Sequence, residues 1–489
     1  MSIAQQVDGL YSISLDSNTD RAPRRLTLHV SSWRLTIIAL VLLSTPCAGS
    51  LIGPQAPSGQ AGLTMPVVKS DSLLNGLRLM LIENTSSADL RLHLRVNSGA
   101  MFDLAGKGGL ADLTAGMLLR GGGGLSAKNV EETVQHLGVR ISVTTGWDAT
   151  DIVMTGPAGN FESMLDLCAK LAVNPGFEQT ELEALKRSRI ELLKRDSANA
   201  GESLKHKALG ELFGSYPFGH PERGTSDTVS KVDRGDLVYY HNRFYLPNNS
   251  ELMITGETTL EEVTRLSRAK LGAWRKGDIV PATFRQPELP GGLKLVVVND
   301  PISRIAKAII AQPGFSRRAN DYYAAAVLTE VLAASNKRLA ASMGADVSIE
   351  TSAHARYLAG PILIAVQSPT DKLHAALDAV MKTLNAFKGG RVDAQEVESA
   401  KQRVIEAFNG RLRTPAGIEE ALLENELYGL GRDYVIRFEE RVSAVTSADC
   451  AQAAQKYLMP QNSVIAALGT AKEIEPALKR LLSGGAPAH

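Results

Sequence analysis

The 489-residue sequence contains few cysteines and few aromatic side chains. Its three cysteines are Cys47, Cys168 and Cys450, and the last two lie in apolar patterns typical of helices. Such cysteines indicate small buried side chains, so neither a disulfide framework nor a cysteine metal site is predicted. Aromatic residues make up 5% of the chain, which argues against the stacking platforms that bind single-stranded nucleic acids.

An excess of charge of either sign is also missing. The 53 lysines and arginines nearly balance the 52 aspartates and glutamates, which gives a formal net charge of +1. This balance provides no electrostatic reason to expect nucleic acid as a partner. Hydrophobic residues make up 44% of the chain and charged residues 21%, as in globular proteins that bury a sizeable core.

Long hydrophobic runs are rare, and the one near the N-terminus is short. Residues 35–43 are apolar, which is too few to span a bilayer but suits the core of a secretory signal. Four arginines precede the run, with no acid after Asp20: Arg21, Arg24, Arg25 and Arg34. Residues 1–48 are therefore predicted to be a signal peptide or an N-terminal anchor, and the protein is expected to be exported, periplasmic or membrane-anchored. Residues 49–67, rich in Gly, Pro and Ser, are predicted to be a linker.

The most informative feature that is present is an internal repeat. Residues 229–256 read VSKVDRGDLVYYHNRFYLPNNSELMITG, and residues 442–469 read VSAVTSADCAQAAQKYLMPQNSVIAALG. The stretches align without a gap, and eight positions of the first are identical in the second: Val229, Ser230, Val232, Asp236, Pro247, Asn249, Ser250 and Gly256. Solenoid repeats are only about 20–50 residues long, so this spacing indicates a duplicated domain. We expect two homologous domains, residues 68–283 and residues 284–485.

The order of strand and helix patterns predicts the fold class. Leu90, Leu92 and Leu94 alternate with polar residues, which is typical of a strand with one buried face. Helical patterns follow, another strand pattern ends the copy, and the second copy repeats this order. Hairpins combined with helices indicate an α+β fold, in which each domain is a mainly antiparallel sheet with helices packed on one side.

Five segments in a fixed order resemble the pitrilysin/insulinase family of zinc peptidases. They are GLADLTAGMLLRG, TELEALKRSRIELL, YPFGHPERGT, FYLPNNSELMITG and LGAW, and the resemblance extends over about residues 68–475. In that family, each half of a subunit is an α+β domain, and two halves close as a clamshell around peptide substrates. Bacterial and mitochondrial members often pair an active subunit with an inactive one. The resemblance therefore implies that the two domains of this chain form half of a clamshell.

The zinc motif of the family is altered in this chain. The family carries H-x-x-E-H on the helix after Gly-Leu-Ala, where this chain has Asp112, Leu113, Thr114, Ala115 and Gly116. Positions 112, 115 and 116 share one helix face, but only Asp112 offers a ligand atom, and Ala115 cannot act as a general base. The distal glutamate ligand of the family maps onto Glu191. Two carboxylates fall short of the three protein ligands of catalytic zinc, so no catalytic residue, metal site or cofactor is expected. Asp112 and Glu191 are interpreted as solvated helix residues.

No substitute site is recognisable in the sequence. None of the nine histidines has a histidine partner three or four residues away, and there is no Gly-x-Ser-x-Gly motif of a serine hydrolase. The family also holds substrate through an arginine and a tyrosine in the second domain. That pair is not recognisable in the corresponding segment NKRLAASMGADVSIE, so the residues that bind substrate stay unknown.

The leading hypothesis is a non-catalytic subunit of a pitrilysin/insulinase-like zinc peptidase complex. Such a subunit would form a heterodimer with an active homologue that carries an intact H-x-x-E-H motif, contributing chamber wall and stabilising its partner. One alternative is an active zinc metalloendopeptidase with an aberrant site. The other is a peptide-binding or scaffold protein that acts alone.

Overall fold

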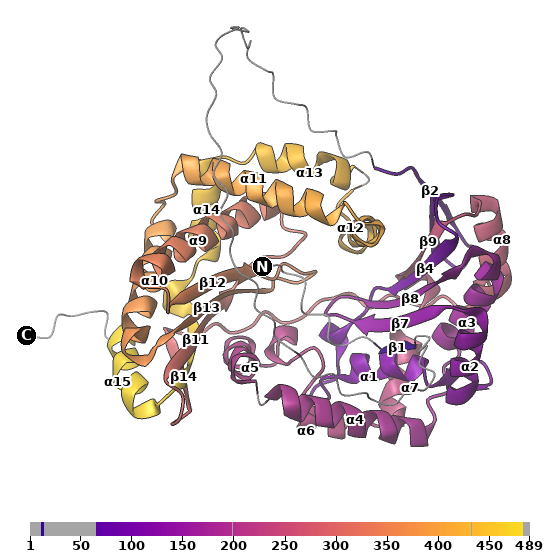
Figure 1. Ribbon diagram of the computed structural model, residues 1–489, viewed down its shortest axis with the longest axis horizontal. Coiled ribbons are helices and arrows are strands. Elements are labelled where there is room, and N and C mark those ends of the chain that lie inside the picture. The colour runs from indigo at the N-terminus through magenta and orange to yellow at the C-terminus, as the bar shows by residue number, and fades with distance from the viewer. Residues whose placement is uncertain (1–10, 14–64, 198, 432, 483–489) are drawn as a thin grey trace, which may run out of the picture.

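The computed structural model describes residues 11–13, 65–197, 199–431 and 433–482. Most of the predicted signal segment 1–48 and of the predicted linker 49–67 lies outside the described residues. The described part forms two α+β halves whose sheets face each other, with helices on the outer sides (Figure 1). This architecture confirms the predicted fold class. Among the described residues, no helix combines the length and the apolar character that crossing a membrane requires.

The first half is built on a seven-stranded sheet with the order β1-β7-β8-β4-β9-β3-β2. Strands β3 and β9 are parallel, and the other neighbouring pairs are antiparallel. The strands are β1 (Tyr11–Ile13), β2 (Val68–Ser72), β3 (Arg78–Glu83), β4 (Asp89–Val96), β7 (Arg140–Thr145), β8 (Thr150–Pro157) and β9 (Ser250–Gly256). A separate two-stranded ribbon is formed by β5 (Gly121–Gly122) and β6 (Leu125–Ser126).

The second half is built on a five-stranded sheet with the order β10-β14-β11-β13-β12. Its strands are β10 (Lys294–Asn299), β11 (Ile305–Pro313), β12 (Ser348–Ala353), β13 (Pro361–Pro369) and β14 (Val464–Gly469). Its single parallel pair is β10 with β14. The order matches β3-β9-β4-β8-β7 of the first half strand for strand, including the position of the parallel pair. The internal repeat in the sequence is therefore a duplicated sheet.

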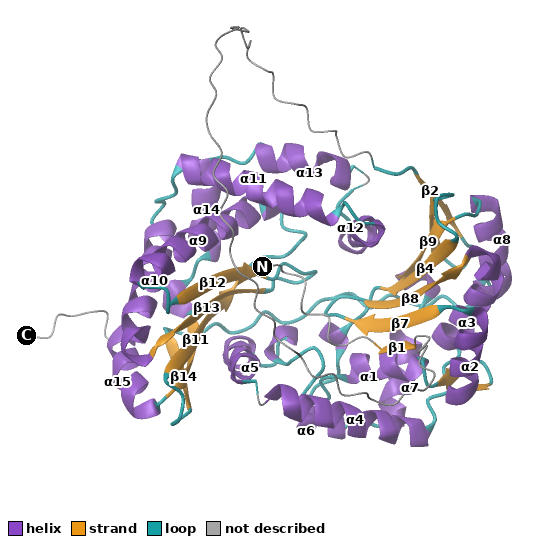
Figure 2. Cartoon of the chain, viewed as in Figure 1, coloured by secondary structure: helices purple, strands orange, loops and turns teal. Residues whose placement is uncertain are grey.

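Helices follow the strands in a similar order in both halves (Figure 2). The first half contains α1 (Leu110–Leu118), α2 (Ala127–Leu137), α3 (Phe161–Val173), α4 (Gln179–Ser197), α5 (Ala200–Phe213), α6 (Ser226–Ser230), α7 (Arg234–Phe244) and α8 (Leu260–Leu271). The second contains α9 (Tyr322–Met343), α10 (Leu373–Lys388), α11 (Ala394–Arg411), α12 (Pro415–Tyr428), α13 (Tyr434–Ser443), α14 (Ser447–Tyr457) and α15 (Ala471–Leu482).

The repeated residues explain why the same helix starts at the same place in each copy. Helix α7 begins with a capping box in which Asp233 and Asp236 satisfy each other's backbone amides, and α14 begins with the same arrangement of Thr446 and Asp449. A capping box pairs two amides that a helix start would otherwise leave unbonded. Retention of Asp236 and Asp449 at matching repeat positions thus conserves a helix start.

Each half has its own core between its sheet and its outer helices. In the second half, Ala308 and Ile310 of β11 face this core, whereas Ile309 and Ala311 face the opposite way. This alternation is the period of two that a strand imposes on its side chains. Cys168 and Cys450 are both buried in these cores and unpaired, as the sequence predicted.

The inner face of each sheet is covered by a helix from the other half. Leu204, Ala208 and Leu212 of α5 pack on the inner face of the second sheet. Leu423 of α12 packs on the inner face of the first sheet, against Met80 and Met253. The two halves therefore exchange equivalent helices, an arrangement that the sequence pattern does not reveal.

Candidate functional site

The altered zinc motif lies on α1, a helix that is buried along its whole length. The carboxylate of Asp103 accepts hydrogen bonds from the backbone amides of Gly109 (2.6 Å) and Ala111 (2.8 Å), which are donors that a helix start leaves unbonded. All nine residues of α1 are buried, and the helix packs against α4, α7 and β7. The motif positions therefore face protein interior.

Asp112 is held in a buried ion pair with Arg189 of α4. The Nε atom of Arg189 lies 2.8 Å from Oδ2 of Asp112, and Nη2 donates a hydrogen bond to Oδ1 at 3.2 Å. Only 3% of Asp112 and 5% of Arg189 are exposed. The interpretation of Asp112 as a solvated helix residue is therefore wrong: its carboxylate is neutralised by a guanidinium inside the protein. Ala115 and Gly116, also buried, add no ligand atom.

Glu191 does not join this pair. It is exposed on α4, as expected for a solvated helix residue, whereas Leu182, Leu185 and Arg189 form the buried stripe of that helix. The residue of α4 that contacts Asp112 is thus Arg189, two positions before Glu191, onto which the distal glutamate of the family maps. Helical periodicity in the sequence could have indicated that Arg189 is buried, because Leu182, Leu185 and Arg189 follow an i, i+3, i+7 spacing.

These residues do not fit a catalytic zinc ion. Zinc in a hydrolytic site takes three protein ligands and one exchangeable position, and the helix face here offers one carboxylate that already binds a cation. Nowhere in the described ranges do three or more His, Cys, Asp or Glu side chains gather as a metal site would require. Arg189 thus places a positive charge beside the first position of the altered motif.

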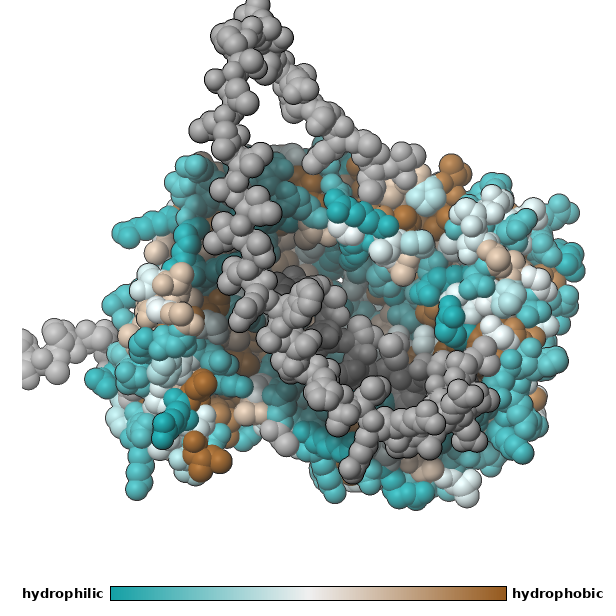
Figure 3. Space-filling view, in the orientation of Figure 1, coloured by the Kyte–Doolittle hydropathy of each residue, from teal (hydrophilic) through white to brown (hydrophobic). Residues whose placement is uncertain are grey.

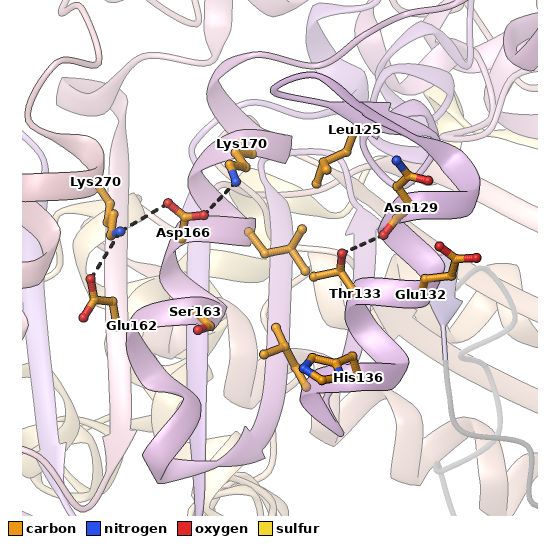
Figure 4. A pocket seen from close by; sticks show the side chains of 12 residues that line it. Leu125, Asn129, Glu132, Thr133, His136, Glu162, Ser163, Asp166, Lys170 and Lys270 are labelled. Atoms are coloured by element: carbon orange, nitrogen blue, oxygen red, sulfur yellow. Dashed lines mark hydrogen bonds and ion pairs between the residues drawn. The ribbon is translucent and has the colours of Figure 1, made fainter.

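A surface groove of about 630 Å³ lies between α2 and α3 of the first half (Figure 4). Four of its charged side chains pair with one another: Lys270 lies 3.3 Å from both Glu162 and Asp166, and Lys170 lies 2.9 Å from Asp166. His136 is the single imidazole among the lining residues. Among the described residues, the groove therefore gathers no set of metal donors.

A partly buried polar network joins the two halves and was not predicted from the sequence. Three side chains point from the inner face of β4 toward α12: Arg91, His93 and Arg95. They form ion pairs there with Glu419 and Glu420. Arg91 donates to Glu419 at 2.5 Å, and Arg95 donates to Glu420 at 2.7 Å. The alternation in β4 predicted a polar face, and the structure shows that α12 covers it.

Asp151 of β8 completes this network. It accepts a hydrogen bond from Nε of Arg95 at 2.7 Å, and its Oδ1 lies 2.8 Å from Nε2 of His93. Burial alone lowers the pKa of His93, but Asp151 and Glu419 outweigh burial and raise it above the ordinary value. For Asp151, burial raises the pKa, but the charges of Arg95 and His93 outweigh burial and bring the pKa below the ordinary value. The network thus links strands β4 and β8 of the first sheet to α12 through ion pairs and hydrogen bonds.

Two family models match the chain. The model described as "Insulinase (Peptidase family M16)" matches residues 78–212, and the model described as "Peptidase M16 inactive domain" matches residues 231–404. The first match includes α1 and α4, so the ion pair between Asp112 and Arg189 lies inside the region that corresponds to the peptidase domain.

Individual relatives are distant. An uncharacterized zinc protease of Rickettsia bellii is 21% identical over 206 residues, which are 42% of this chain and 50% of that protein. The chain thus spans about half the length of that relative. A probable mitochondrial-processing peptidase subunit beta of Arabidopsis thaliana is 21% identical over 433 residues, covering 84% of this chain and 80% of that protein.

A solved structure has the same fold. A peptidase M16 inactive domain from Pseudomonas fluorescens matches with a TM-score of 0.74 at 19% identity, covering 82% of this chain and 98% of that one. This likeness extends over both halves and agrees with the duplicated α+β architecture.

Proposed function

Because the chain belongs to peptidase family M16, the insulinase or pitrilysin family of zinc peptidases, we propose that it is a non-catalytic subunit of such a peptidase complex. In this role it contributes chamber wall and stabilises an active homologue with an intact H-x-x-E-H motif. The observation that carries the proposal is the buried pair of Asp112 and Arg189. A guanidinium beside the one remaining ligand position neutralises the carboxylate that a metal would need.

The exposed surface bears on how a partner would dock. Large hydrophobic side chains are exposed at separate segments of both halves: Val67, Leu74, Leu192, Tyr239, Ile279, Leu289, Ile302, Ile305, Ile436 and Leu482. The face seen in Figure 3 is mostly hydrophilic, with small separate hydrophobic patches. An interface with an active homologue is therefore expected to be largely polar, as in non-obligate complexes.

Purification from the native host tests this proposal. A tagged chain at its native expression level should retain a homologue with H-x-x-E-H in a 1:1 ratio, identified by mass spectrometry, and the chain alone should not cleave peptides. Peptidase activity of the pure chain that EDTA abolishes would instead establish the active metallopeptidase. The absence of any homologue would overturn the subunit role.

One observation favours a second candidate, a peptide-binding protein that acts alone. Strand β1 pairs antiparallel with β7 at the end of the first sheet, with Tyr11 opposite Val143 and Ile13 opposite Ile141. An extended segment can add to an exposed strand in this way through main-chain hydrogen bonds. If residues 1–48 are removed as a signal, the edge of β7 becomes free to receive another extended peptide.

We also propose export from the cytoplasm. The support is the arginine-rich segment before the apolar residues 35–43. N-terminal sequencing of protein from the native host should find a start near residue 49, and a cytosolic product that retains Trp33 would contradict export.

A further inference from the structure

A second cavity, of about 330 Å³, lies in the second half between the start of α9 and the segment that joins α12 to α13. We call it the arginine–tyrosine pocket. Ten residues line it: Arg317, Arg318, Ala319, Asn320, Tyr322, Tyr323, Tyr428, Gly429, Leu430 and Arg441. Three of them are arginines and three are tyrosines, and none of the ten is an acid. The pocket is separate from the altered zinc motif on α1.

Arg317 is the unusual residue of this pocket. It is only 7% exposed, and no carboxylate of a described residue lies within ion-pair distance of it. Its guanidinium sits over the ring of Tyr322, 3.8 Å from the centroid, and 4.9 Å from the ring centroid of Tyr434, whose hydroxyl accepts its hydrogen bond. Arginines are almost never fully buried unless they are paired, so a buried arginine held only by tyrosines is a cation that lacks its anion.

One acid in this region, Glu424, is already engaged by another arginine. Glu424 of α12 accepts two hydrogen bonds from Arg411, at 3.2 and 2.8 Å. Arg411 and Arg317 both lie close to Tyr434, and Glu424 lies close to it as well. Glu424 is thus bound by Arg411, whereas Arg317 has no carboxylate within ion-pair distance among the described residues.

The rim of the pocket repeats the combination of arginine and tyrosine. Arg318 is exposed and lies over the ring of Tyr357, 4.6 Å from its centroid. Arg441 donates a hydrogen bond to the hydroxyl of Tyr323 at 3.5 Å, and it lies 3.8 Å from Asp433. Arg441 is therefore partly neutralised, whereas Arg318 adds a second charge without an acidic partner in the described ranges.

We propose that the arginine–tyrosine pocket binds the carboxylate of a small organic acid or of a peptide C-terminus. A guanidinium presents a planar fork of donors that matches a carboxylate in a bidentate pair, and such pairs are strong when they are desolvated. The tyrosine rings provide an apolar wall for the group that carries the carboxylate. The volume lies at the small end of the range for ligand pockets, about 300–1,000 Å³. This proposal does not depend on a catalytic or a non-catalytic role of the chain.

Isothermal titration of the pure chain tests the pocket with defined probes. N-acetyl-phenylalanine should bind, and its amide should not, because the amide lacks the charge. A tripeptide that ends in phenylalanine with a free carboxylate, compared with its amide, shows whether peptide ends enter as well as free acids. Equal affinity for acid and amide would overturn the proposal, and so would binding of inorganic phosphate without binding of either acid.

Variants of Arg317 test whether the ligand binds in the arginine–tyrosine pocket. Arg317→Met should weaken binding of N-acetyl-phenylalanine at least about tenfold, because a charge-assisted bidentate pair contributes more than 1.4 kcal/mol. If Arg317→Met does not fold, Arg317→Lys is the second test. Lysine retains the positive charge but lacks the planar fork of donors, so this variant should also weaken binding. The matched control is Arg140→Met, at an exposed arginine of the first half, which should leave the affinity unchanged. Unchanged affinity in folded Arg317 variants would overturn the assignment.

Discussion

At the scale of single residues, Asp112 and Arg189 form a buried ion pair at the altered zinc motif. Removal of one partner of a buried ion pair costs about 3–5 kcal/mol, because the remaining charge loses this interaction inside the protein. Arg189→Met should therefore lower the free energy of unfolding by about that amount in urea denaturation. The double variant Asp112→Leu/Arg189→Met removes both charges and should lose less stability than Arg189→Met alone.

An exposed ion pair provides the control. Lys128 and Glu132 lie 3.6 Å apart on α2, and both are exposed, so Lys128→Met should change the free energy of unfolding by less than about 1 kcal/mol. A loss of less than about 1 kcal/mol for Arg189→Met would show that the buried pair does not stabilise the fold.

Glu251 should make stability depend on pH. Burial raises the pKa of Glu251 to about 7, against hydrogen bonding from Asn97 and the charges of Arg78 and Arg95, which lower it. The folded protein keeps this carboxyl protonated up to about pH 7, whereas the unfolded chain ionises it near its ordinary pKa of 4.5. Stability is therefore lost as the pH rises from about 4.5 to 7.

Glu251→Gln removes this titration and retains the acceptor for Asn97. The stability of the variant relative to the native chain should rise by about 1–3 kcal/mol between pH 5 and pH 8, measured by urea denaturation. Glu131→Gln, at an exposed glutamate of α2, should show no such change. A difference for Glu251→Gln that does not vary with pH would contradict a raised pKa.

The sequence predicted part of this site but not its geometry. The loss of ligand atoms at Ala115 and Gly116 needs no structure to recognise. Helical periodicity places Arg189 on the buried stripe of α4 with Leu182 and Leu185, but it does not identify Asp112 as the partner of Arg189. The same limit applies to Arg317, whose lack of an acid depends on contacts between α9, α12 and α13 that are distant in the sequence.

At the scale of elements, the exchange of α5 and α12 holds the two halves together. Leu212 of α5 is 1% exposed on the inner face of the second sheet. Leu212→Ala should cost about 2–5 kcal/mol through lost burial and the cavity left behind. It should also speed proteolysis within residues 275–293, which form no helix or strand, because α5 then holds the second half less firmly.

The control for this element is Leu192 of α4, which is 43% exposed. Leu192→Ala should change the free energy of unfolding by no more than about 0.5 kcal/mol and leave proteolysis unchanged. An equal loss of stability in both variants would contradict the role assigned to α5. The sequence predicted helices in both copies, but an apolar stripe on a helix does not identify the sheet that it covers.

At the scale of the whole molecule, the internal repeat predicted two sheets of one design, and the strand orders confirm it. The inner faces, however, have diverged. The first sheet presents Arg91, His93 and Arg95 to α12, whereas the second presents apolar residues such as Ile309 and Leu363 to α5. The alternation of residues along the strands predicts in part which face of each sheet is polar. It does not predict that this face is buried, because the covering helix comes from the other half.

The purified chain should contain far less than one zinc ion per molecule. The reason is the missing donor set at positions 112, 115 and 116 and the cation of Arg189 beside it. Elemental analysis after dialysis measures the metal, and a homologue with an intact H-x-x-E-H motif, treated in the same way, is the control. About one zinc per chain that disappears in Asp112→Ala would contradict a site without metal.

The activity of a 1:1 mixture tests the subunit role most directly. The chain is combined with a homologue from the same host that carries H-x-x-E-H, and complex formation is measured by gel filtration alongside the rate of peptide cleavage. We predict a 1:1 complex that cleaves peptides faster than the homologue alone, and loss of this activity when the motif glutamate of the homologue is replaced by glutamine. If the two chains neither associate nor cleave faster together, the subunit role is contradicted.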